Sequence, residues 1–322
     1  MRLFSLKHKV GNIVIKDHVI RYVELKQQQP LVLHTCEEWP LPEGIVRDGK
    51  IVDEEQFAHI MEQCVDMWKM KHRRIRFLVP DPLIVIRKVP LPKEIDVEDV
   101  RSYLFMEIGS TILLPFEDAV FDYALLEKTK EAFHILLFAA PEANVMQYAQ
   151  LFEEVKLKPI VADISPLSLY RLFYTFHLAN DVDHFLFVQF DLSSLNVSVF
   201  YQHRPIFTRQ LAFDAQWTYW EKTNEGWTWL KEGEPERQLE DLYKELERVM
   251  SFYRFSLQQG KAQITRIVIT GDHPLINTFA NLLQERLDIA VETLTLPLSV
   301  DPAYYLPIGL GLKEGSAHAS RN

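Results

Sequence analysis

The pattern of apolar and polar positions predicts a mixed α/β protein that begins with three strands. Short apolar runs predict strands near residues 12–15, 19–26 and 31–38. Apolar residues then recur at three- and four-residue steps over about residues 54–71, which predicts an amphipathic helix. Asp53 and Gln56 resemble a capping box at its start. The run RIRFLV from Arg74 predicts a further strand.

The second half of the chain repeats this order. Strands are predicted from Phe185, Asn196 and Ile206, followed by a long helix over about 237–259 and the strand RIVIT from Arg266. Another helix is predicted after Pro274. The fold class is therefore α/β, built from two βββαβα units.

Extra chain over about residues 84–164 predicts a small α/β subdomain inserted into the first unit. Its order is strand (84–89), helix (97–109), two strands (119–127 and 133–140), helix (142–156) and strand (159–164). We expect a first domain over 1–183, which contains this insertion, and a second domain over 184–315. Residues 316–322 are expected to be a flexible tail.

Composition excludes several classes of function. The 322 residues carry a formal net charge of −10, which opposes non-specific nucleic-acid binding because that binding depends on Lys and Arg at phosphates. Two cysteines form neither a disulfide framework nor a metal cluster. There is no run of about 18 apolar residues. We therefore expect a cytoplasmic protein that reaches a membrane only through a partner.

A duplicated unit of three antiparallel strands, a helix and a parallel strand resembles the actin-like ATPases, which include actin, sugar kinases and DnaK-type chaperones. The resemblance implies that the first hairpin of each unit reaches for the phosphates of ATP from one side of a central cleft. A fold alone does not give a function.

The insertion carries a more specific resemblance, to PilM, the actin-like protein of type IV pilus, competence and related secretion machines. The matching features are a Pro-rich strand end, a helix that ends in a Glu-containing run, an "IP" turn, an acidic turn, a "DY" pair, an "AAP" strand end and an "LKP…D…S" run. Here they are Leu91-Pro92, Glu107, Leu114-Pro115, Glu117-Asp118, Asp122-Tyr123, Ala139-Ala140-Pro141, Leu157-Lys158-Pro159, Asp163 and Ser165. The segments 41–57, 245–256 and 306–314 also resemble the family, so the likeness runs over nearly the whole chain.

The opening hairpin, NIVIKDHVIRYVEL (residues 12–25), departs from the family pattern GIDIGSSSVKAVEL. Val14 replaces the acid that helps to place magnesium, and Lys16 replaces the turn glycine that lets backbone N–H groups approach phosphate. Asp17 and His18 replace serines, and Arg21 replaces a lysine. A metal-poor phosphate contact through Lys16 or Arg21 is the route that remains.

The second hairpin keeps more of the pattern. Asp191 keeps its acid, while Ser193 and Ser194 stand near the position of its glycine. Gly271-Asp272 keeps half of the adenosine-side "GG". Asp191 is equally well explained as a strand-end turn former, and Gly271 as a left-handed exit from a strand.

Segment 213–236 is rich in Trp and charged residues where the family builds its fourth subdomain. Alternation about a turn at 224–226 favours a long hairpin, and an exposed aromatic docking surface is the alternative. In either case that subdomain is small or rebuilt.

The resemblance implies a pilus or competence assembly adaptor with a degenerate nucleotide site. Its partners would be the N-terminal tail of a PilN-like membrane protein and other inner-membrane assembly proteins. The groove for this tail is expected near Arg87, Val89, Phe105 and Glu107. We expect no catalytic residues, no metal site and no required cofactor.

The alternative is an active ATPase, PilM- or FtsA-like, that uses ATP and magnesium as a switch or for polymerisation. A sugar or acetate kinase is disfavoured because the phosphate glycines and substrate motifs are missing.

Overall fold

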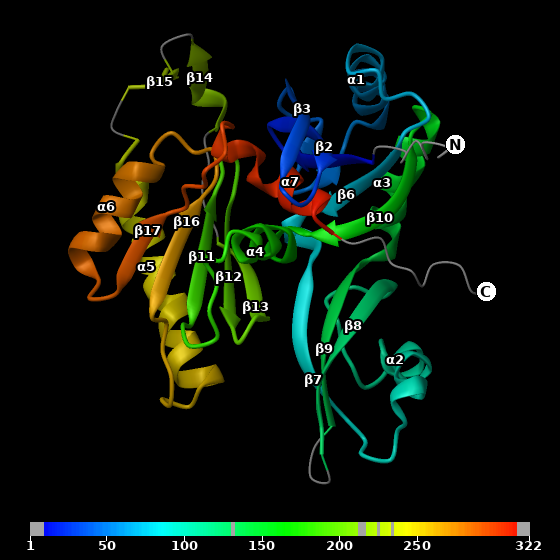
Figure 1. Ribbon diagram of the computed structural model, residues 1–322, viewed down its shortest axis with the longest axis vertical. Helices are drawn as coiled ribbons and strands as arrows, with labels where there is room; N and C mark the ends of the chain where they lie inside the picture. The colour runs from blue at the N-terminus through cyan, green and yellow to red at the C-terminus, as the bar shows by residue number, and fades with distance from the viewer. Residues whose placement is uncertain (1–9, 130–132, 212–216, 224–225, 233–234, 314–322) are drawn as a thin grey trace.

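Two five-stranded sheets, each with its own helices, form the two halves of the molecule. The computed structural model describes residues 10–129, 133–211, 217–223, 226–232 and 235–313. The predicted tail over 316–322 lies outside these residues. Figure 1 shows the two sheets side by side, with a smaller three-stranded sheet extending from the first half.

The first sheet has the order β10-β6-β1-β2-β3. Strands β1 (Gly11–Lys16), β2 (Val19–Gln27) and β3 (Val32–Pro40) are antiparallel, whereas β6 (Arg74–Val79) and β10 (Lys158–Ile164) run parallel to β1. Helices α1 (Glu54–Met67) and α3 (Glu142–Glu154) pack on one face of this sheet around Phe57, Phe77 and Phe152. The short strands β4 (Val46–Arg47) and β5 (Lys50–Ile51) form a small hairpin before α1.

The second sheet repeats this arrangement in the order β13-β12-β11-β16-β17. Its strands are β11 (Phe185–Phe190), β12 (Leu195–Tyr201), β13 (Arg204–Leu211), β16 (Arg266–Thr270) and β17 (Ala290–Thr293). Helices α5 (Arg237–Ser251) and α6 (Ile276–Arg286) correspond to α1 and α3. All six residues of β11 are buried because the central strand is covered on both faces.

Each of the two units ends in a helix. Helix α4 (Ser165–Thr175) follows β10, and α7 (Tyr305–Gly311) ends the second unit after a short 3₁₀ turn, η5 (Pro302–Tyr304). They pack against each other between the two sheets (Figure 1). Gly309 permits this contact, because an added Cβ would lie 2.1 Å from the Ser168 carbonyl oxygen.

The predicted order of strands and helices is confirmed, with three differences at helix ends. The first helix ends at Met67, because Lys69 turns the chain with a φ of 56°. In the insertion, a 3₁₀ turn, η2 (Val97–Asp99), precedes α2 (Val100–Glu107), and Gly109 follows with a φ of 86°. The predicted helix over 237–259 is α-helical only to Ser251 and continues as a π-helical turn, η4 (Phe252–Leu257), before Gly260.

The insertion has its own three-stranded sheet, in the order β7-β9-β8. Its strands are β7 (Val85–Leu91), β8 (Ala119–Lys128) and β9 (Phe133–Pro141), and α2 covers one face. Helix α3 and β10 belong instead to the core and sheet of the first domain. The separate sheet therefore ends near Pro141, whereas the sequence pattern predicts the end of the insertion at about 164.

The aromatic segment forms a hairpin, as predicted. A 3₁₀ turn, η3 (Trp217–Tyr219), leads into β14 (Trp220–Thr223), which pairs with β15 (Gly226–Trp229). Trp220 lies opposite Trp229 in this pair. Residues 212–216, 224–225 and 233–234 of the segment lie outside the described part of the chain.

Candidate functional site

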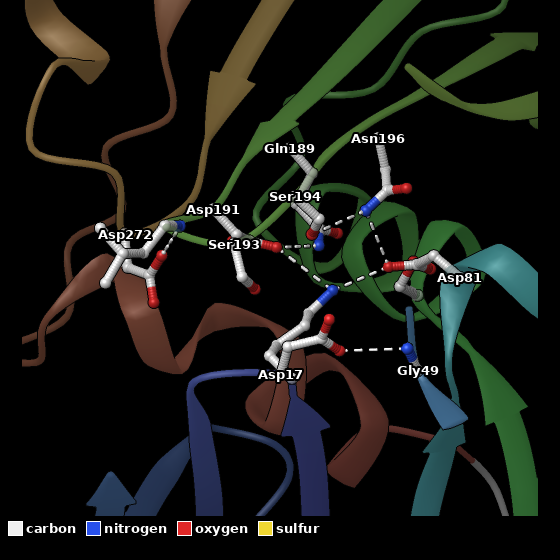
Figure 2. Close-up of polar contacts among 12 residues, drawn as sticks. Asp17, Gly49, Asp81, Gln189, Asp191, Ser193, Ser194, Asn196 and Asp272 are labelled. Carbon is white, nitrogen blue, oxygen red and sulfur yellow. Dashed lines mark hydrogen bonds and ion pairs between the residues drawn. The ribbon is translucent and has the colours of Figure 1, made fainter. Parts of the chain in front are cut away.

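The turns of two equivalent hairpins face each other between the two domains. The β1–β2 turn carries Lys16 and His18, and the β11–β12 turn carries Asp191 and Ser193. A third segment, η1 (Asp81–Leu83), follows β6 in the first domain. We refer to the polar contacts of these segments, and of the side chains on neighbouring strands and loops that join them, as the cleft network (Figure 2).

Lys16 is the centre of the cleft network. Its ammonium Nζ lies 2.7 Å from Asp81 Oδ2 in the first domain and 3.2 Å from Asp191 Oδ2 in the second. The Lys16 side chain is only 10% exposed. Burial alone would lower the pKa of Lys16, but the carboxylates of Asp81 and Asp191 outweigh it and raise this pKa above its ordinary value. Lys16 is therefore a buried cation that joins two carboxylates from two domains.

Both carboxylates have further partners that hold them in place. Asp81 accepts hydrogen bonds from Asn196 Nδ2 at 3.0 Å and from the Ser165 hydroxyl. Asp191 accepts one from Gln189 Nε2 at 2.5 Å, and burial raises the pKa of Asp191. Figure 2 shows Asp81 and Asp191 on opposite sides of the ammonium group that both contact. Because Asn196 belongs to the second domain, it adds a second contact across the cleft.

A second buried pair crosses the cleft at Asp272. Arg21 Nη2 lies 2.5 Å from Asp272 Oδ2, and His18 Nε2 lies 2.9 Å from the same oxygen. The other oxygen of Asp272 accepts the Leu192 N–H at 2.7 Å. Burial would raise the pKa of Asp272, but Arg21 and His18 hold it well below its ordinary value. His18 Nδ1 also lies 2.8 Å from Ser193 Oγ.

The β14–β15 hairpin adds a more exposed contact at the edge of the cleft. Lys222 Nζ of β14 lies 2.7 Å from Glu38 Oε1 of β3, and Glu38 Oε2 lies 3.3 Å from Arg21 Nε. Trp220 meets the His273 ring edge-on, with 5.8 Å between ring centroids. The hairpin therefore connects the second domain to the outer strand of the first.

Three of the predicted nucleotide residues have other roles in the structure. The Asp17 carboxylate accepts the N–H groups of Asp48 and Gly49 at 2.8 and 3.0 Å, so it caps the β4–β5 turn (Figure 2). Gly271 has a φ of 129°, and an added Cβ would lie 2.0 Å from the Phe190 carbonyl oxygen. Ser194 closes the tight turn after β11 through backbone bonds with Asp191.

The cleft network also contains residues that the sequence-based prediction missed. The sequence pattern does not predict Asp81, Asn196 or Glu38 in this site, and it gives His18 only as the replacement of a serine. Asp81 has a detectable signal, because it lies two residues after the end of a predicted parallel strand. The pairing itself had none, because Asp81 lies 65 residues from Lys16 in the chain.

These residues do not fit a magnesium nucleotide. Val14 is 2% exposed within β1 and supplies no oxygen for a metal. The buried carboxylates of Asp81, Asp191 and Asp272 already have cationic partners from the first hairpin, so phosphate would bring negative charge against them. Among the described residues, no group of three or more His, Cys, Asp or Glu residues is arranged to hold a metal ion.

Two of the grooves outside the cleft border the insertion. One, the edge-strand groove, has a volume of about 360 Å³ and is lined by Ala124 and Phe138 of the insertion, Ile164 and Leu167 of the first domain, and His203 of the second. The other, the cationic groove, has a volume of about 610 Å³ between the insertion and the second domain. Both grooves share Leu126, Leu136, Arg204 and Pro205.

The four residues predicted for the partner groove do not line one common groove. Val89 is buried in the core of the insertion beneath α2, and Phe105 on α2 is 79% exposed. Arg87 lines the cationic groove and donates to the Leu113 carbonyl oxygen at 2.8 Å. Glu107 accepts a hydrogen bond from Thr111 on the loop after α2.

Comparison with known families decides the family of this chain. The family model described as "Type IV pilus assembly protein PilM" matches residues 12–219. The chain belongs to the PilM family. No curated protein sequence matches it. Among the described residues, no helix is long and apolar enough to cross a membrane.

Solved structures agree with the PilM assignment at the level of the fold. A "PilM-PilN type IV pilus biogenesis complex" matches with a TM-score of 0.76 and 17% identity, over 94% of this chain and 97% of that chain. The ethanolamine utilization protein EutJ from Carboxydothermus hydrogenoformans matches at 0.52 and 10%, over 94% and 89% of the two chains. The cytoplasmic domain of EpsL, from the type II secretion system of Vibrio cholerae, matches at 0.51 and 10%, over 95% and 96%. The fold is actin-like, as predicted.

Replacing Lys16 by Met is expected to destabilise this PilM-family protein by about 3 kcal/mol or more, because two buried carboxylates lose their cation. Urea unfolding measures the change. The matched control is Lys93→Met at an exposed position, which is expected to change the unfolding free energy by less than about 0.5 kcal/mol. Equal stability of the two variants would contradict the central position of Lys16.

Proposed function

We propose that this PilM-family protein is an assembly adaptor whose domains are held together by its own ion pairs rather than by a nucleotide. The observation that carries the proposal is the Lys16 ammonium between Asp81 and Asp191, at the turn where an actin-like ATPase would hold phosphate. Arg21 and Asp272 form a second such pair. A protein that is closed in this way can present a fixed binding surface without ATP.

The proposed partner is the N-terminal tail of a PilN-like membrane protein. The structural relative with the highest similarity among those described above is a PilM-PilN complex, which motivates the choice of partner. Such a tail would hold the adaptor at the cytoplasmic face of the inner membrane, next to other assembly proteins. It would lose chain entropy on docking, so the groove must supply compensating contacts.

The edge-strand groove is the site that we propose for this tail. It lies between β8, an outer strand of the three-stranded sheet, and β10, an outer strand of the first-domain sheet. An extended peptide can pair with an outer strand through its backbone. Phe138, Ile164 and Leu167 offer apolar contacts for its side chains. His203 also lines the groove, and its Nδ1 lies 2.9 Å from the Tyr170 hydroxyl.

Mg-ATP at millimolar concentration is expected to leave the melting temperature unchanged. The carboxylates of the cleft network are already paired with cations of this protein, and β1 offers no ligand for a metal ion. Differential scanning fluorimetry measures this, and the PilN-like tail serves as the positive control in the same assay. A rise of several degrees with Mg-ATP that is lost in Asp191→Asn would support the active ATPase instead.

The N-terminal tail of a PilN-like protein is expected to bind with micromolar or tighter affinity in isothermal titration calorimetry. Ala124→Arg places a large cation in the edge-strand groove at an exposed position and is expected to weaken binding about 10-fold or more. Met106→Arg, on the exposed face of α2, is the matched control and is expected to have little effect.

A third variant separates two sites for the tail. If Phe105→Arg abolishes binding while Ala124→Arg does not, the tail binds at α2, as the sequence-based prediction had it. If the tail does not bind to the wild type at all, the adaptor function is refuted.

A further inference from the structure

The cationic groove differs in charge from the rest of the protein. The chain carries a net charge of −10, yet the charged residues that line this groove are Arg87, Lys88 and Arg204. Among the described residues that line it, none is acidic. The positive charge of the side chains that line the groove attracts a negatively charged ligand and orients it before contact.

The base of the groove is apolar and comes from two parts of the molecule. Leu136 of β9 contributes from the insertion, while Pro205 and Phe207 of β13 contribute from the second domain. Leu136 and Pro205 are buried, so this surface is fixed by the packing of both sheets. A ligand that binds here therefore needs apolar groups between its negative charges.

The rim of the groove presents apolar side chains to solvent. Phe252 and Leu257, on the π-helical turn that ends α5, are 45% and 41% exposed. Phe252 meets the Phe207 ring edge-on at 5.8 Å, so its position is fixed by packing. Apolar groups that border a recess in this way are typical of a surface that another molecule covers.

Two of the cations are oriented by backbone carbonyl groups. Arg87 Nη1 donates to Leu113 at 2.8 Å, and Arg204 Nη1 donates to Leu126 at 3.4 Å. Each guanidinium has five N–H donors, so one such bond leaves others for a carboxylate. A side chain that is already oriented loses less entropy when a ligand binds.

We propose that the cationic groove binds a short acidic and apolar segment of a partner protein. Its carboxylates would contact Arg87, Lys88 and Arg204, and its apolar side chains would cover Leu136 and Phe207. The groove volume of about 610 Å³ is within the range of pockets that hold several side chains. An anionic membrane surface fits less well, because a bilayer is flat and this groove is recessed between the insertion and the second domain.

This site is distinct from the proposed tail site, although the two grooves adjoin. Arg87, Lys88 and Phe252 line only the cationic groove, whereas Ala124 and Leu167 line only the edge-strand groove. Variants in these two sets can therefore separate the two proposals.

A library of short random peptides displayed on phage, selected on the full-length protein, tests the proposal. Enriched peptides are expected to combine Asp or Glu with large apolar residues and to bind in fluorescence anisotropy. The double variant Arg87→Glu/Lys88→Glu is expected to weaken this binding about 10-fold or more. The control Lys93→Glu/Lys261→Glu makes the same charge change at exposed positions outside both grooves and is expected to leave binding within about 2-fold.

Other outcomes overturn the proposal. It is wrong if no peptide is enriched, or if enriched peptides bind the Arg87→Glu/Lys88→Glu variant as well as the wild type. It is also wrong if Ala124→Arg, rather than the double variant, removes binding, since the peptides would then occupy the edge-strand groove. Stronger binding to phosphatidylserine vesicles than to the selected peptides would assign the cations to a membrane.

Discussion

The buried ammonium of Lys16, shared between Asp81 and Asp191, joins the two domains at the point where their hairpin turns meet. A charge in such a place is costly unless it is fully paired, so it stabilises only the arrangement that brings both carboxylates to it. Arg21 and Asp272 impose the same condition a few residues away. Separation of the domains would break the Lys16–Asp191 and Arg21–Asp272 contacts, so both pairs favour a closed cleft.

The duplicated fold explains how these charges meet and why grooves form elsewhere. Equivalent hairpins in the two units place their turns opposite each other, while α4 and α7 pack together between the sheets. The β12–β13 hairpin then reaches from the second domain to the insertion, where Arg204 and Pro205 border both grooves. The closed cleft and the two grooves are therefore consequences of one domain arrangement.

Much of this fold follows from local pattern, and the cleft network does not. The apolar periodicity of β1–β3 and β11–β13 predicted both hairpins, and the loss of the acid at Val14 indicated a changed site. The partners of Lys16 depend on contacts between distant segments, which periodicity does not encode. The same limit applies to α3 and β10, whose patterns predicted a helix and a strand but not their return to the first sheet. The π-helical turn after Ser251 was missed because the apolar stripe continues through Tyr253 and Leu257.

The most direct test of the closed cleft is a distance between spin labels on the two domains, at Glu62→Cys on α1 and Glu285→Cys on α6, measured by double electron–electron resonance. Both positions are exposed, whereas burial raises the pKa of the native Cys36 and Cys64 thiols to about 11 and about 12, which slows their labelling. One narrow distance distribution is expected, unchanged by Mg-ATP and broadened by Lys16→Met. A broad distribution that Mg-ATP narrows would contradict a cleft held closed by the protein's own ion pairs.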